Sequence, residues 1–195
     1  MTDVTNTFLA SPISFLQEHP CSCSSEFTGL QTLNVQVMLD DVGVARLMRT
    51  PVGQAGALFY ILGWMRQQAS VGTLGDGARF FFTGPLSGCT FAVDKNWYRP
   101  KVIHVNQTVL AGAMNVNGMM ATVTNHMAAS TSWLKPWKSG PNITVVQSHN
   151  RHPDHIYNIF GYRTGGGWNF YQQVVHVRGL GDMVVQDLRE LDTWF

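Results

Sequence analysis

Apolar and polar residues along this chain follow patterns typical of β-strands. Residues 33–39 alternate, with Leu33, Val35, Val37 and Leu39 on one side, which predicts a half-buried strand. After a turn at residues 40–43, residues 44–48 are expected to return as the second strand of a hairpin. Further strands are predicted where β-branched and aromatic residues cluster between Gly, Pro, Asn or Asp: residues 80–82, 91–93, 102–105, 143–147, 155–162 and 170–177.

Helical patterns are few and short. We expect a helix near residues 14–18, another over residues 54–70 and a third near residues 121–129. Residues 1–30 are expected to be a polar lead-in, the tail from residue 183 a final strand, and residues 164–167 a hairpin turn. Strands dominate and no regular strand–helix alternation is present. The pattern therefore predicts an α+β fold, with a largely antiparallel or mixed β-sandwich core flanked by a few helices, in a single domain over residues 1–195.

The composition narrows the class of partner. Charged residues make up only 13% of the chain, hydrophobic residues 45%, and the formal net charge is +1. Because the basic residues are scattered, we expect no nucleic-acid partner and no membrane-surface binding. No apolar segment is long enough to predict a transmembrane helix. The N-terminus carries Asp3 and no Lys or Arg before the first apolar residues, which argues against a Sec signal peptide.

Three cysteines are present: Cys21, Cys23 and Cys89. An odd number is poor support for a disulfide framework. The Cys21-Ser-Cys23 spacing lacks the second pair that a zinc site would need, so these two are interpreted as incidental thiols. Cys89 differs because it follows a Gly-rich turn at the end of a predicted strand.

The turn before Cys89 suggests a nucleophile. A thiol is activated by a neighbouring histidine or by backbone donors, and His104 lies fifteen positions later in another predicted strand. Thr83 ends the entering strand, where its oxygen can accept from His104 and fix the ring tautomer. The glycines allow successive N–H groups to converge as an oxyanion hole. The residues expected to form that turn are Leu86, Ser87 and Gly88. A buried structural cysteine and a satisfied core histidine are the alternative interpretation.

Residues 86–89, Leu-Ser-Gly-Cys, resemble the motif of the cytotoxic necrotizing factor catalytic domain and the related Burkholderia lethal factor family. The chemotaxis receptor deamidases are similar in having a Gly-Cys turn and a downstream histidine. Thr83, six positions before Cys89, and His104 match the order of the site residues in these families. The resemblance covers about residues 80–106.

The resemblance implies cysteine-dependent deamidation of a glutamine in a target protein. Cys89 would be the nucleophile, His104 its acid–base partner and Thr83 a site residue, with transglutamination as a possible side activity and with no cofactor or metal. It further implies a monomeric bacterial toxin or effector, secreted or injected without a Sec signal and acting on a host protein in the host cytosol.

Two other functions remain open. A non-catalytic, β-rich binding domain would use an aromatic lip formed by Trp133, Trp137 and Trp168. A zinc-dependent hydrolase would use His149, His152 and His155, although Pro153 prevents these residues from sharing a helix face. His126 and His176 are interpreted as structural.

Overall fold

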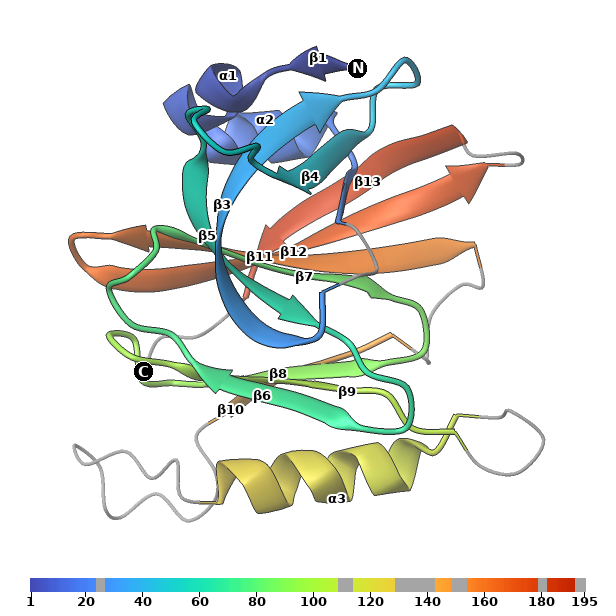
Figure 1. Ribbon diagram of the computed structural model, residues 1–195. Coiled ribbons are helices and arrows are strands. Elements are labelled where there is room, and N and C mark those ends of the chain that lie inside the picture. Colours follow the sequence, from blue (N-terminus) through green and yellow to red (C-terminus); the bar gives the residue numbers. More distant parts are fainter. Residues whose placement is uncertain (24–26, 109–113, 129–142, 149–153, 179–181, 192–195) are drawn as a thin grey trace.

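The protein is built from two β-sheets with helices on their outer faces, as a computed structural model shows (Figure 1). The structure describes residues 1–23, 27–108, 114–128, 143–148, 154–178 and 182–191. α1 and α2 cover the larger sheet, and α3 covers the smaller one. The elements are β1 (Thr2–Asp3), α1 (Thr5–Ala10), α2 (Pro12–Glu18), β2 (Cys21–Cys23), β3 (Gly29–Leu39), β4 (Ala45–Arg49), β5 (Ala57–Gly63), β6 (Ala69–Thr73), β7 (Phe80–Leu86), β8 (Thr90–Asp94), β9 (Lys101–Val105), α3 (Val116–Met127), β10 (Ile143–Gln147), β11 (His155–Thr164), β12 (Gly167–Arg178) and β13 (Asp182–Glu190).

Within the described residues, the larger sheet has nine strands and the smaller has four. The larger sheet follows the order β13-β12-β11-β7-β5-β3-β4-β2, with β1 beside β3, and the smaller follows β10-β8-β9-β6. Most neighbours are antiparallel, whereas β5–β7 and β2–β4 are parallel. The expected α+β class with a mixed, largely antiparallel sandwich is confirmed, as is the hairpin turn between Thr164 and Gly167.

β7 shows how the apolar run at residues 80–82 serves two cores. Phe80 and Phe82 pack with α1 and α2, whereas Phe81 points between the two sheets. A strand covered on both faces needs an unbroken apolar sequence, because successive side chains point to opposite sides. Thr83 follows the same alternation and therefore lies on the inter-sheet side. In the other sheet, Phe91 of β8 faces the inter-sheet core, and Ala92 faces α3.

Two sequence predictions are wrong. Residues 54–70 form β5 and the start of β6 rather than a helix, because Phe59, Ile61 and Leu62 are buried on opposite faces of a central strand. The 1–30 segment is more than a polar lead-in, since it contains two helices and two strands, and Phe8 and Phe15 are buried in the core. Phe8 and Phe15 lie in short apolar stretches between polar residues in the sequence, so no regular apolar pattern indicated that they would be buried.

The strand before the cysteine continues farther than expected. β7 does not end at Gly84 but runs to Leu86, through a cis peptide bond between Gly84 and Pro85. Its pairing with β11 shifts there: Thr83 pairs with Ile159 and Leu86 with Tyr157. Two residues of β7 thus oppose Asn158 alone, which is a β-bulge.

A buried amide network fastens α2 and β2 to the larger sheet. The Gln173 side chain, fully buried in β12, donates to the carbonyls of Leu16 (2.7 Å) and His19 (2.8 Å). Its oxygen accepts from the backbone N–H of Cys21 at 2.9 Å and from the Asn158 side chain at 3.1 Å. Every polar atom of this buried amide is therefore satisfied.

Replacing Gln173 by Ala should lower the free energy of unfolding by about 3 kcal/mol, because several buried donors and acceptors lose their partner at once. Urea denaturation measures this change. The control is Gln31→Ala, which removes an exposed amide that donates to the Thr28 carbonyl at 3.0 Å. Equal stability of the two variants would contradict the assigned role of the network.

Candidate active site

Thr83 and His104 meet between the two sheets. Thr83 comes from β7 of the larger sheet and His104 from β9 of the smaller one, and their side chains are 0% and 1% exposed. The Thr83 Oγ1 and the His104 Nδ1 are 2.8 Å apart. This contact between sheets agrees with the prediction that Thr83 lies beside the ring.

The hydrogen bonds of Thr83 fix the tautomer of His104. The Thr83 hydroxyl donates its only proton to the Leu62 carbonyl at 2.6 Å. Its oxygen must then accept from the His104 Nδ1–H, so the proton of the neutral ring lies on Nδ1. The Nε2 atom is buried and has no hydrogen-bond partner among the described residues. His104 therefore presents an unprotonated Nε2 inside the protein, which is the form that a general base requires.

Cys89 lies on the same face of the smaller sheet as His104. Phe91 pairs with His104 and Thr90 with Val105, so continuation of the register places Cys89 opposite Asn106 and diagonal to His104. Diagonal neighbours on one face lie about 7 Å apart, within reach of an imidazole ring. The topology thus brings together the thiol and the ring that the sequence suggested.

Burial keeps the thiol and the imidazole neutral. It raises the pKa of Cys89 to about 11, although the backbone N–H of Ser87 and the side chain of Asn106 lie close enough to the sulfur to act in the opposite direction. It lowers the pKa of His104 to about 4. At neutral pH the free protein therefore holds a thiol beside a neutral base rather than a thiolate–imidazolium pair.

The turn before Cys89 is held by a residue that the sequence analysis missed. Ser148, just after β10, accepts from the Gly88 N–H at 2.6 Å and donates its hydroxyl proton to the Cys89 carbonyl at 2.9 Å. Gly88 has a φ of +102°, and a Cβ there would collide with the Met114 side chain. Only glycine fits this position, and its amide is already engaged in a bond to Ser148.

The three residues expected to supply oxyanion donors therefore differ in whether their N–H group is free to act. Leu86 is fully buried in the inter-sheet core, and the Gly88 N–H is bonded to Ser148. The Ser87 N–H, in contrast, faces the Cys89 sulfur, together with the Asn106 side chain. Sequence reasoning missed Asn106, but its position two residues after His104 on one strand face was the available signal.

Other predicted features lie elsewhere. Trp168 is fully buried, so it cannot form an aromatic lip; Trp133 and Trp137 lie outside the described residues, as do His149 and His152.

His155 pairs across strands with His176, with ring centroids 5.0 Å apart. Among the described residues, no group of three His, Cys, Asp or Glu side chains is placed to hold a metal ion. Within that same part of the chain, no helix is long and apolar enough to cross a membrane.

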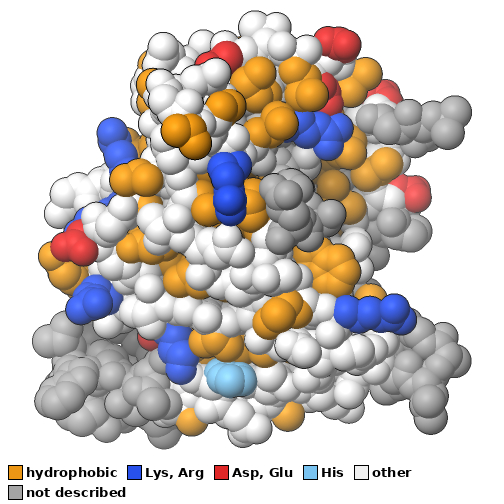
Figure 2. All heavy atoms as spheres, viewed as in Figure 1, with side chains coloured by type: hydrophobic (Ala, Val, Ile, Leu, Met, Phe, Trp, Pro, Cys, Tyr) orange, Lys and Arg blue, Asp and Glu red, His pale blue; other side chains and the backbone are white. Residues whose placement is uncertain are grey.

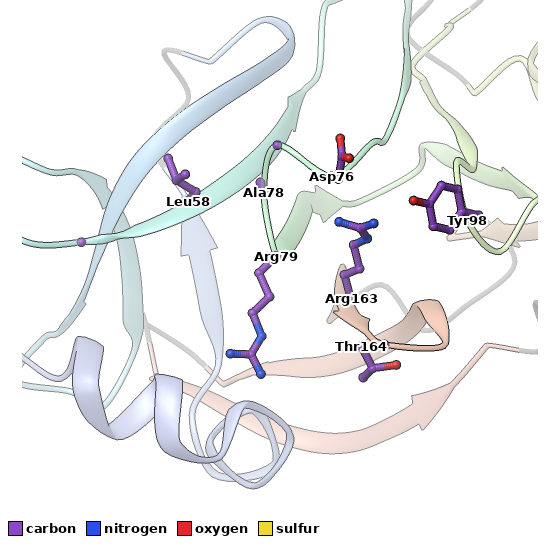
Figure 3. A pocket seen from close by; sticks show the side chains of 10 residues that line it. Leu58, Asp76, Ala78, Arg79, Tyr98, Arg163 and Thr164 are labelled. Atoms are coloured by element: carbon purple, nitrogen blue, oxygen red, sulfur yellow. The ribbon is translucent and has the colours of Figure 1, made fainter.

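A cavity of about 780 Å³ lies at the opposite end of β7 (Figure 3). Arg163 and Tyr98 point into it, with the guanidinium 5.4 Å from the Tyr98 ring centroid, whereas Arg79 points away. Seven residues of β7 separate this cavity from the cysteine turn, a span of about 20 Å. The lining residues are Gly56, Leu58, Asp76, Gly77, Ala78, Arg79, Tyr98, Arg163, Thr164 and Gly165.

Comparisons with known proteins show a likeness to solved structures but no match to a family model or a curated protein. Among solved structures, the chain is similar to the C-terminal domain of CNFy from Yersinia pseudotuberculosis, with a TM-score of 0.49 and 10% sequence identity, over 83% of this chain and 71% of that one. The function proposed below is argued from the site itself.

The buried neutral His104 should make stability depend on pH. In the unfolded chain the ring has its ordinary pKa of 6.5, whereas in the folded protein burial lowers that pKa to about 4. The unfolded chain thus binds the extra proton first, and stability is lost as pH falls from 6.5 towards 4, by about 3 kcal/mol in total.

Urea denaturation of the wild type and of His104→Gln across this pH range measures the effect. Carboxylates titrate equally in both proteins, so the difference between the two pH profiles isolates His104. Identical profiles would show that the ring is not held neutral.

Proposed function

We propose that this chain is a cysteine-dependent protein-glutamine deamidase. The observation that carries the proposal is the directed hydrogen-bond chain from the Leu62 carbonyl through Thr83 to His104 Nδ1, which leaves Nε2 as a buried base on the face from which Cys89 projects. A core histidine with a purely structural role would be expected to bond through both ring nitrogens.

The first half-reaction forms a thioester. Cys89 Sγ attacks the carboxamide carbon of a glutamine side chain while its proton passes to His104 Nε2. When the tetrahedral intermediate collapses, the C–N bond breaks and Nε2–H protonates the departing nitrogen, which leaves as ammonia. A base and nucleophile that start neutral avoid burying an ion pair before the substrate arrives.

The second half-reaction consumes water. His104 Nε2 takes a proton from the water as its oxygen attacks the thioester carbon, and the sulfur departs and recovers the proton from Nε2–H. The products are a glutamate side chain and free Cys89. A primary amine in place of water would give transglutamination.

The developing negative charge on the carboxamide oxygen needs donors. The Ser87 N–H and the Asn106 side chain already face the sulfur, so they are placed next to the atom that the substrate carbon would bond. Because Gly88 donates to Ser148, Asn106 takes the place that the sequence assigned to the Gly88 amide.

The entrance to the proposed site is narrow. Cys89 is 4% exposed, whereas Ser87 is exposed and Asn106 and Gly88 are half-buried. The entrance therefore lies along these three residues and admits a slender side chain with its carboxamide leading. We further propose a bacterial toxin or effector that acts on a host protein in the cytosol; this part is supported by the Leu-Ser-Gly-Cys motif at residues 86–89 with Thr83 and His104.

Cys89→Ser and His104→Ala should each reduce glutamine deamidation at least about a thousandfold, because nucleophile and base act as a unit. The measurements are ammonia release and peptide mass spectrometry of proteins from a host lysate, in which glutamine-to-glutamate conversion is counted. Cys23→Ser, which changes a thiol outside the site, is the matched control and should retain activity. Conversion that persists in Cys89→Ser would disprove the mechanism.

Asn106→Ala should lower kcat about a hundredfold with little change in KM, because the lost donor acts on the charge that develops in the transition state. Gln107→Ala is the neighbouring control, since the Gln107 side chain bonds Thr122 of α3 at 3.0 Å instead of facing the thiol. Equal kcat values for the two variants would remove Asn106 from the oxyanion site.

A further inference from the structure

Ser70, on β6, places a second unsatisfied polar atom beside the base. Ser70 pairs directly with His104 across β6 and β9. The flanking residues Ala69 and Val71 pack with the α3 core, so the Ser70 side chain points to the inter-sheet side, as His104 does. Directly paired side chains have Cβ atoms about 5 Å apart.

Both atoms are buried, and the part of the chain that the structure describes gives neither a partner. Ser70 is 1% exposed, and within that part neither its Oγ nor the His104 Nε2 has a hydrogen-bond partner. The larger sheet closes over β6 here, since Leu30 of β3 fills the space above Gly72, the next residue on the same face. A buried hydroxyl without a partner destabilises a fold, and alanine would avoid that cost.

We propose that the Ser70 hydroxyl and the His104 Nε2 together form a binding recess for the nitrogen of the substrate carboxamide, and then for the water that replaces it. The inference rests on the proposed function and extends it to a residue outside the cysteine turn. During acylation, the departing nitrogen receives the proton from His104 Nε2–H and donates one of its own N–H groups to Ser70 Oγ. After ammonia leaves, water occupies the same position, gives one proton to Nε2 and donates the other to Ser70 Oγ as its oxygen attacks the thioester.

Ser70→Ala should therefore separate activity from stability. The melting temperature of the variant should equal or exceed that of the wild type, because the Ser70 hydroxyl makes no hydrogen bond to the residues that the structure describes. Its kcat for ammonia release should fall at least about tenfold, the equivalent of one hydrogen bond in the transition state. Thr50→Val is the matched control, since the Thr50 hydroxyl is also buried and has no partner in the described ranges, but lies outside the site. This variant should keep full activity.

A binding measurement tests the recess without turnover. In a Cys89→Ser background, propionamide mimics the glutamine side chain, and the ¹⁵N resonance of His104 Nε2 reports hydrogen bonding to it. We expect propionamide to shift this resonance, and the added Ser70→Ala change to weaken the apparent affinity several-fold. Thr50→Val in the same background should leave the shift unchanged.

The outcomes distinguish the two proposals. In one outcome, no ammonia is released from glutamine-bearing proteins, but propionamide shifts the His104 resonance and the shift depends on Ser70. That result would overturn the deamidase proposal and support the recess. Ammonia release with no such shift, or with a shift that Ser70→Ala leaves intact, would overturn the recess. A melting temperature of Ser70→Ala well below the wild-type value would also overturn it, because the hydroxyl would then have a partner within the fold.

Discussion

The hydrogen bond between Thr83 and His104 joins the two sheets at the point where the chemistry is proposed. Thr83 belongs to the nine-stranded sheet and His104 to the four-stranded one, so the bond forms only when the sandwich is closed. The Leu62 carbonyl then gives this bond its direction, because it accepts the only hydroxyl proton of Thr83. The parallel pairing of β5 with β7 places Leu62 level with Thr83. Three strands from two sheets therefore determine which nitrogen of one imidazole is basic.

Neutrality distinguishes this site from one with a preformed thiolate. A threonine orients the ring without offering a negative charge, and burial lowers the pKa of His104, so the imidazole stays neutral. In the proposed mechanism, the inter-sheet core keeps water away from His104 and so strengthens each polar contact that the substrate would make. Charged side chains on the face shown in Figure 2 are dispersed among polar and apolar ones, whereas Thr83, Cys89 and His104 are buried.

Sequence reasoning reached part of this structure. Thr83, Cys89 and His104 could be named because a Gly-rich strand end and a strand histidine leave a local pattern. Asn106 was missed although it lies two residues after His104 on the same strand face. Ser70 could not be named, since its proposed role depends on the pairing of β6 with β9, and pairing between distant strands leaves no trace in residue spacing. The central strand β5 was mistaken for a helix for a related reason: burial on both faces removes the alternation that identifies a strand. Ser148 holds the turn from 59 residues away.

The bulge at Gly84 and Pro85 adds a residue to β7 without changing which side chains face the inter-sheet core. In a regular strand, Thr83 and Pro85 would share a face, but the extra residue opposite Asn158 puts Pro85 outside and returns Leu86 to the inter-sheet core with Thr83. Beyond Leu86, the turn at Ser87 and Gly88 carries the chain into the smaller sheet, where Cys89 shares the inter-sheet core with Phe91. A regular strand without the extra residue would also place Leu86 beside Thr83, because residues two apart share a face. The bulge therefore works as a splice: Pro85 leaves the sheet for solvent, while the residues on either side of it keep their places in the core.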